Sequence, residues 1–229
     1  MDELRGMLQD RGVSLVGFAD LSAVDEATRR GHPRAVSMGL ALTPSIIAGI
    51  ARGPTDAYRK EYDRTNAWLS ETALRAAEFL SAKGWRAEHR PATGDWNPQT
   101  LKAPFFHKMA ATLSGLGWIG RCDLLVTPEF GSAVRWSTVL TDAPLATGKP
   151  QTESRCGNCH ACVDVCPGKA CSGKEWRQGM PREDFWDARA CMAGMKKINQ
   201  ELGTTYGICG MCIAACPLTT AYLKKSCRL

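Results

Sequence analysis

One stretch of the sequence, from Cys156 to Pro167, constrains the rest of the chain more than any other. It reads C-G-N-C-H-A-C-V-D-V-C-P, so its four cysteines follow the spacing C-x2-C-x2-C-x3-C-P. Thiolates two residues apart let a tight loop bind three corners of an iron–sulfur cube, and the proline turns the chain away after the fourth. This spacing indicates ligands of iron–sulfur clusters.

A second motif, C-x2-C-x3-C-P, ends at Pro217 and repeats the first one without its leading cysteine, whose place is taken by Tyr206. A second cluster therefore needs a thiolate from elsewhere, and Cys171 and Cys191 are the alternatives. We favour Cys191, because the segment D-A-R-A-C is expected to be helical and can present the thiol, whereas Cys171 lies in a Gly- and Lys-rich turn. The count is then eight thiolates for two [4Fe-4S] clusters.

Bacterial ferredoxins have this spacing, and by resemblance to them the two ligand sets cross over. The first cluster is then expected on Cys156, Cys159, Cys162 and Cys216. The second is expected on Cys166, Cys191, Cys209 and Cys212. The other cysteines, Cys122, Cys171 and Cys227, are not expected to be ligands. Structural zinc is disfavoured, because a zinc site needs neither the third cysteine of the run nor two C-P endings.

Length and composition add a few limits. With 229 residues, 44% of them apolar, the chain can bury a core and form one substantial and one smaller domain. Eleven cysteines without an evident export signal indicate a reducing compartment, so a cytoplasmic location is expected. No stretch reads as a membrane span, and the net charge of +6 contains no block of Lys and Arg. Membranes and nucleic acid are therefore not expected partners.

Strands and helices alternate through about the first 140 residues, which predicts an α/β or α+β domain. Strands are expected at residues 13–19, 35–42, 85–90, 123–127 and 132–141. Helices are expected at residues 1–10, 21–30, 43–53, 55–83 and 103–114. We therefore predict an α/β cofactor- or substrate-binding domain over residues 1–145. A ferredoxin-like domain with two [4Fe-4S] clusters is predicted over residues 146–229.

Several motifs together resemble the epoxyqueuosine reductase family. They are G-L-G-W-I-G-R at residues 115–121, L-L-V-T-P-x-x-G-S at 124–132, L-T-D at 140–142, and then D-A-R-x-C and the two cysteine motifs. The resemblance is strong over residues 100–220 and loose over residues 13–90. Members of that family bind cobalamin between an α/β domain and a ferredoxin-like domain, and their clusters deliver electrons to cobalt. The resemblance also implies that Cys191 is a cluster ligand.

The resemblance implies candidate residues for the cofactor and for catalysis. Glycines in the G-L-G-W-I-G-R stretch can let the backbone approach a flat ligand or a cluster, or the stretch can simply pack the domains together. The candidate cofactor-binding residues are Gly115, Gly117, Trp118, Gly120, Arg121 and Ser132. His107 and Lys108 are the candidate catalytic residues, since a histidine can deliver protons near neutral pH. The alternative is that His107 only packs against the sheet.

The sequence also departs from the family pattern. Leu101 occupies the position of the family's proton-donating aspartate, and leucine cannot donate a proton. The helical repeats that family members use near tRNA are not found after Cys216. The chain therefore resembles a short paralogue, for which reduction of epoxyqueuosine is not expected.

These features together predict an iron–sulfur oxidoreductase. Electrons from a low-potential donor of the ferredoxin or flavodoxin type would pass through two clusters to cobalamin or to a substrate held by the N-terminal domain. The acceptor would be a small molecule or a corrinoid. The alternative is an electron-transfer or corrinoid-activating partner protein without a substrate of its own.

Overall fold

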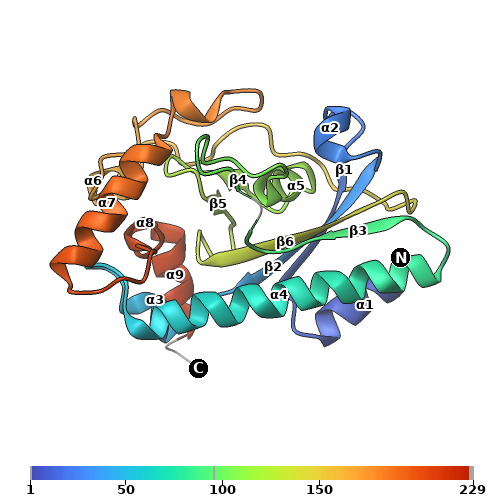
Figure 1. Ribbon diagram of the computed structural model, residues 1–229, viewed down its shortest axis with the longest axis horizontal. Coiled ribbons are helices and arrows are strands. Elements are labelled where there is room, and N and C mark those ends of the chain that lie inside the picture. The colour runs from blue at the N-terminus through green and yellow to red at the C-terminus, as the bar shows by residue number, and fades with distance from the viewer. Residues whose placement is uncertain (1, 95, 227–229) are drawn as a thin grey trace. The chain divides into compact units, whose positions relative to one another are not determined.

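The computed structural model describes residues 2–94 and 96–226 of the chain (Figure 1). Its helices are α1 (Asp2–Asp10), α2 (Glu26–Arg29), α3 (Pro44–Ala48), α4 (Asp56–Ala82), α5 (His107–Leu113), α6 (Ala161–Asp164), the 3-10 helix η1 (Arg182–Asp184), α7 (Ala188–Glu201), α8 (Met211–Ala214) and α9 (Pro217–Ser226). Its strands are β1 (Leu15–Asp20), β2 (Arg34–Ala41), β3 (Ala87–Arg90), β4 (Trp118–Ile119), β5 (Leu125–Val126) and β6 (Val134–Thr141).

The chain forms two compact units that interleave along the sequence. Unit 1 comprises residues 1–41, 64–117 and 135–151, and unit 2 comprises residues 42–63, 118–134 and 152–229. Each unit is assembled from three segments of the sequence. These units do not test the predicted domain boundary between residues 145 and 146, which stays a prediction.

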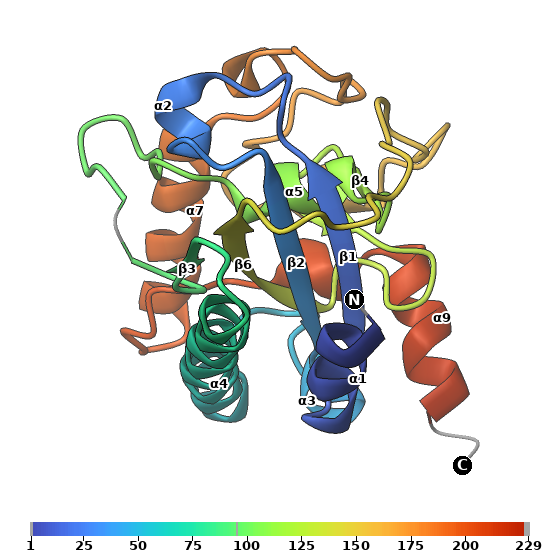
Figure 2. The same cartoon turned by 90° about the vertical axis from the view of Figure 1, so that its right-hand side faces the viewer.

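A four-stranded sheet with the order β1-β2-β6-β3 is the centre of unit 1. β1 pairs antiparallel with β2, with Leu15 opposite Gly39, and β3 pairs antiparallel with β6, with Ala87 opposite Thr141. Figure 2 shows α1 and α4 on the same side of this sheet, and α5 packs on β1 and β2. The predicted layering of helices on a sheet is therefore confirmed.

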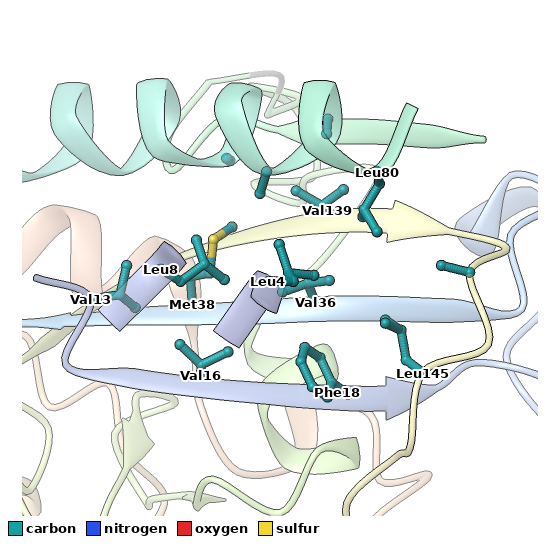
Figure 3. Packing of buried hydrophobic residues seen from close by; sticks show 14 of the residues in the cluster. Leu4, Leu8, Val13, Val16, Phe18, Val36, Met38, Leu80, Val139 and Leu145 are labelled. Carbon is teal, nitrogen blue, oxygen red and sulfur yellow. The ribbon is translucent and has the colours of Figure 1, made fainter. Parts of the chain in front are cut away.

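Side chains that alternate along the strands divide this sheet between two cores. Val36, Met38 and Val139 pack with residues of α1 and α4 (Figure 3). Ala35 and Leu140, their neighbours in sequence, pack with residues of α5 instead. Successive residues of a strand point to opposite faces, so strands covered on both faces appear in the sequence as continuous apolar runs.

The long helix α4 matches its prediction closely, because its signals are local. Leu69, Ala73, Ala76 and Leu80 are buried at intervals of four, three and four residues, which keeps them on one face. The helix ends before Gly84, whose φ of +88° suits glycine far better than any other residue.

Three other predicted helices are shorter than expected. Of residues 21–30, only Glu26–Arg29 is helical, because the Asp25 carboxylate accepts a hydrogen bond from the Thr28 amide at 2.9 Å and starts the helix there. Helix α3 begins at Pro44 as predicted but ends at Ala48 rather than near residue 53. Helix α5 begins at His107 rather than at residue 103.

The core of unit 2 joins residues that are far apart in the sequence. Its buried members are Leu42, Ile47, Ile50, Tyr58, Ala133, Ile208 and Ile213. The Leu42 amide donates to the Ala133 carbonyl at 2.9 Å, and the Tyr222 hydroxyl donates to the Leu42 carbonyl at 2.9 Å. This core places residues 42–63 and 118–134 in one unit with both cysteine motifs. Among the described residues, no helix has both the length and the apolar character that crossing a membrane requires.

Candidate iron–sulfur and cofactor site

Both cysteine motifs lie in unit 2, and their short helices pack against each other. Cys162 belongs to α6 and Cys212 to α8, and these two helices are in contact. The Cys159 amide donates to the Cys156 carbonyl at 3.1 Å, which closes the loop of the first motif. The two motifs are therefore brought together, as ligand sets that exchange their last cysteine require.

Cys191 lies near the start of α7, so the predicted helix at this position is confirmed. The Asp187 carboxylate caps the helix by accepting hydrogen bonds from the amides of Arg189 at 2.8 Å and Ala190 at 3.0 Å. This cap fixes where the helix begins and thereby the face on which Cys191 lies.

Two glycines let α7 pack closely against the turn that follows the first motif. A Cβ atom on Gly194 would lie 2.3 Å from the Gly168 amide nitrogen, and one on Gly168 would lie 2.1 Å from the Ala190 carbonyl oxygen. Only glycine permits such an approach of two backbones. The contact holds the helix that carries Cys191 beside the turn that follows Cys166.

Three thiols predicted for the second cluster interact in the structure. Burial, followed by the neighbouring thiols of Cys166 and Cys209, raises the pKa of Cys191 to about 11. Burial and, to a smaller extent, Cys166 also raise the pKa of Cys209. Crowded thiolates repel one another unless a metal centre neutralises them, and metal binding displaces the thiol protons. The donor set therefore fits a cluster.

Cys171, the alternative ligand, has different neighbours. It is buried, and its backbone forms an antiparallel bridge with Trp186. Burial, then Cys166 and Cys162, raise its pKa. Cys191 thus interacts with Cys166 and Cys209 of the second set, whereas Cys171 interacts with Cys166 and Cys191 of the second set and with Cys162 of the first. The choice of Cys191 as the ligand remains a prediction.

A further thiol, Cys122, lies among the predicted ligands. It is buried, and its side chain interacts with Cys162 and with Cys212. Its hydrogen bond with Cys162 lowers its pKa, but the bond with Cys212 and burial raise the pKa more, so that it lies well above its usual value. Nothing in the local sequence identifies this position except that Cys122 directly follows the glycine-rich motif. Cys227 lies outside the described residues.

The arrangement of the thiols differs from that of a site for a single metal ion. Within residues 2–94 and 96–226, no group of three or more His, Cys, Asp or Glu side chains is arranged to hold one metal ion. In a [4Fe-4S] cluster each thiolate binds a different iron, so the ligand sulfurs stand farther apart than those around one ion.

The glycines of the predicted cofactor stretch pack against the chain itself. A Cβ atom on Gly115 would lie 2.6 Å from the Lys149 carbonyl oxygen, and one on Gly120 would lie 2.9 Å from a methyl group of Val126. Gly117 is buried. Helix α5 precedes this stretch rather than a strand, which disfavours a dinucleotide-binding loop. The close packing accounts for Gly115 and Gly120 without a ligand.

Two other predicted cofactor residues carry unpaired polar atoms. Trp118 is 6% exposed and Ser132 is 3% exposed. The Trp118 indole nitrogen and the Ser132 hydroxyl have no hydrogen-bond partner among the described residues. Buried polar atoms are normally paired, so the unpaired atoms of Trp118 and Ser132, both in unit 2, fit polar groups of a bound cofactor.

His107 is held by two hydrogen bonds within unit 1. Its Nε2 donates to the Pro91 carbonyl at 2.9 Å, and its Nδ1 then accepts from the Thr138 hydroxyl at 2.9 Å. Burial lowers its pKa to about 4. A histidine that is neutral and paired at both nitrogens matches the packing alternative, and the proton-delivery role stays a prediction. Lys108 follows it in the first turn of α5 and is half-buried.

A cavity of about 200 Å³ opens beside His107 in unit 1. Its described lining residues are Arg90, Pro91, Ala92, Thr93, Gly94, Trp96, Ala103, Phe105 and His107. Leu101 lies in a tight loop in which the Asn97 carboxamide accepts from the amides of Gln99 and Thr100, both at 2.9 Å. Leu101 has a φ of +54°, which is uncommon for a bulky residue.

No protein-family model matches the chain. The epoxyqueuosine reductase of Synechococcus sp. (strain CC9605) is 35% identical over 153 residues, which cover 62% of this chain and 44% of that protein. The tetrachloroethene reductive dehalogenase of Dehalobacter restrictus is 29% identical over 193 residues, which cover 80% of this chain and 31% of that protein. The chain thus spans about half the length, or less, of these curated relatives.

Solved structures share the fold. An epoxyqueuosine reductase with an epoxyqueuosine-modified tRNA-Tyr stem loop has a TM-score of 0.67 at 19% identity and covers 96% of this chain, with 65% of that structure matched. A reductive dehalogenase whose structure suggests a mechanism for B12-dependent dehalogenation has a TM-score of 0.62 at 17% identity, with coverages of 93% and 35%. A tRNA thus accompanies one relative, although nucleic acid is not an expected partner of this chain.

The relationship rests on the sequence matches, and the structures agree with it in fold. Curated epoxyqueuosine reductases match this chain repeatedly, over as many as 180 residues. The motifs from Gly115 to Pro217 predict the same relationship. The chain is therefore similar in sequence to epoxyqueuosine reductases and shares their fold.

Proposed function

We propose that this chain is an iron–sulfur oxidoreductase that passes electrons through two [4Fe-4S] clusters to cobalamin or to a substrate held by its α/β part. The first cluster would be held by Cys156, Cys159, Cys162 and Cys216. The second would be held by Cys166, Cys191, Cys209 and Cys212. The observation that carries the proposal is the convergence in unit 2 of both cysteine motifs with Cys191.

Cobalamin is the proposed acceptor. When bound, it supplies a cobalt centre that can be reduced. The unpaired indole nitrogen of Trp118 and the unpaired hydroxyl of Ser132 support a polar ligand at these residues. A related reductive dehalogenase is associated with B12-dependent chemistry. The donor of electrons would be a low-potential ferredoxin or flavodoxin.

The substrate is proposed to differ from epoxyqueuosine in tRNA. Leu101 occupies the position that resemblance assigns to the proton donor, and its aliphatic side chain holds no transferable proton. The same observation favours the second candidate function, a corrinoid-activating or electron-transfer partner that needs no proton donor of its own.

Metal analysis of anaerobically purified protein tests the clusters. About eight iron and eight acid-labile sulfide per chain are expected. A content near four iron, or stoichiometric zinc, would contradict the eight-thiolate assignment.

A tRNA assay tests the substrate. The reduced protein is expected to leave epoxyqueuosine-modified tRNA unchanged. Leu101→Asp is a suitable second variant, because aspartate tolerates the left-handed backbone at this position better than leucine does. Conversion by the unaltered protein would overturn the proposal that its substrate is different, and conversion only by the variant would support it.

A further inference from the structure

Arg121 lies in the turn between β4 and β5, and only 6% of its surface is exposed. Its Nε donates to the Cys159 carbonyl at 3.0 Å, its Nη2 donates to the Gly157 carbonyl at 2.5 Å, and its Nη1 donates to the Gly173 carbonyl. The Glu175 carboxylate lies 3.5 Å from Nη2 and balances the buried charge. One side chain therefore ties together both ends of the segment 157–173, which contains three predicted cluster ligands.

This arrangement uses properties that only arginine has. The guanidinium is planar, always charged, and carries five donors in a fixed fork. A lysine keeps the charge but has a single compact ammonium group on a flexible stem. Without the guanidinium, the carbonyls of Gly157, Cys159 and Gly173 lose a charged donor, and hydrogen bonds to a charged group stabilise more than ordinary ones. The conformation of the first cysteine loop thus depends on Arg121.

The neighbours of Arg121 in the β4–β5 turn also face the cysteine motifs. A Cβ atom on Gly120 would lie 3.7 Å from the Cys156 sulfur. Cys122 interacts with Cys162 of the first motif and Cys212 of the second. The turn at residues 120–123 is therefore next to both predicted ligand sets.

We propose that Arg121 is a positioning residue that holds the first cysteine loop ready to bind its cluster, and that its charge raises the reduction potential of that cluster. Cluster potentials depend on net charge and on hydrogen bonding around the sulfurs. A nearby positive charge stabilises the reduced cluster, which is the more negative state. The effect on potential rests on the proposed function, whereas the ordering of the loop does not.

Three variants of the full chain test this inference under anaerobic conditions. Arg121→Met removes the charge and the donors at similar length, and Arg121→Lys keeps the charge alone. Arg155→Met is the matched control, because Arg155 is exposed, directly precedes Cys156 and belongs to the same unit. Iron and sulfide content and redox titration followed by electron paramagnetic resonance are the readouts.

Arg121→Met is expected to lose up to half of the iron, about four of eight atoms per chain, and any first cluster that it keeps should have a lower potential. Arg121→Lys should also lose iron, but its remaining first cluster should stay near the wild-type potential. Arg155→Met should change neither quantity, because water screens its charge. Wild-type iron content and potentials in both Arg121 variants would overturn the proposal.

Hydrogen exchange of the metal-free chain separates this inference from the proposed function. Faster exchange at residues 156–175 in Arg121→Met, with unchanged exchange in unit 1, is expected. If the wild-type protein binds no iron, the proposed function fails, and this exchange pattern alone decides whether Arg121 orders the loop. If Arg121→Met unfolds throughout, wild-type loop exchange in Arg121→Lys would overturn the requirement for the guanidinium fork.

Discussion

The surroundings of Cys191 and Cys171 in the structure bear on which of them completes the second ligand set, which the cysteine spacing leaves open. Both precede the second cysteine motif, and the spacing alone allows either to complete the second ligand set. In the structure Cys191 interacts with Cys166 and Cys209, whereas Cys171 interacts with Cys166 and Cys191 and also with Cys162 of the first set. Cys191 therefore lies among members of one set.

Substituting each of these cysteines should separate their roles. Cys191→Ala is expected to lose one cluster, about half of the iron, because the second set then has only three thiolates. Cys171→Ala, the matched control, should keep the full iron content. Iron and sulfide analysis of the anaerobic proteins measures both. The opposite pattern would move the ligand to Cys171.

The buried His107 should make the stability of the chain depend on pH. Its pKa is about 4 in the folded protein and about 6.5 in an unfolded chain. Below pH 6.5 the unfolded chain therefore binds a proton that the folded state does not, so stability falls between pH 6.5 and about 4 by at most about 3 kcal/mol. Above pH 6.5 this residue should have no such effect.

Urea unfolding of the wild type and of His107→Gln at pH 7.5 and pH 5 measures this dependence. The amide of glutamine can still donate to the Pro91 carbonyl but does not titrate. The variant should lose less stability than the wild type on acidification, while other titrating groups affect both proteins alike. Equal losses in the two proteins would mean that His107 is not held neutral.

At the residue scale, the sequence predicts a set of candidate ligands, but it does not indicate which distant residues contact them. The cysteine spacing is a local pattern, so all eight candidate ligands can be identified from it and from the resemblance. Arg121 and Cys122 contact the first motif from 36 or more residues away. Such contacts form only when the chain folds, and no local sequence pattern indicates them. Arg121 is consequently predicted as a cofactor-binding residue, but its guanidinium faces the cysteine loop.

Elements whose signals are local can be predicted well. Helix α4 has a continuous apolar stripe and a terminal glycine, and its predicted and observed bounds agree within about one residue. Strands β4 and β5 contain two residues each, so neither shows a periodicity, and β4 is not predicted. Their pairing, with Trp118 opposite Val126, depends on the turn between them.

The contact between α7 and the turn at Gly168 gives a test at the scale of elements. Gly194→Ala should destabilise the protein by roughly 1–3 kcal/mol, because its methyl group would overlap the Gly168 backbone. The displaced helix would move Cys191 from Cys166 and reduce the iron content. Thermal unfolding and iron analysis measure the two effects.

Gly6→Ala is the matched control for this substitution. Gly6 also lies within a helix, but no atom lies within 4 Å of a Cβ placed there. The control should leave the iron content unchanged and stabilise α1 by about 0.5–1 kcal/mol. Full iron content in Gly194→Ala would show that the close contact does not position Cys191.

At the scale of the whole molecule, the layered α/β character is predictable, whereas the sequence does not indicate that segments of the two units interleave. Alternating strands and helices predict the sheet of unit 1. The segments 42–63 and 118–134 nevertheless belong to unit 2, because Leu42, Tyr58 and Ala133 share a core with Ile208 and Ile213. Contacts between residues as distant in the sequence as Leu42 and Ile213 leave no pattern in composition or in linker-like stretches.

Cobalamin binding tests the proposed function of the complete chain. Titration of the reduced protein with cobalamin should give saturable binding, and the absorption spectrum of the corrinoid measures it.

Trp118→Phe keeps an aromatic ring but removes the buried indole donor that has no partner among the described residues. If a bound cobalamin accepts this hydrogen bond, its loss should weaken binding about five-fold, corresponding to about 1 kcal/mol. Trp85→Phe is the matched control, because Trp85 is 39% exposed, and it should leave the affinity unchanged. Saturable binding that Trp118→Phe leaves unaltered would place the corrinoid elsewhere on the chain. A protein that carries both clusters but never binds cobalamin would instead be an iron–sulfur reductase with a different acceptor.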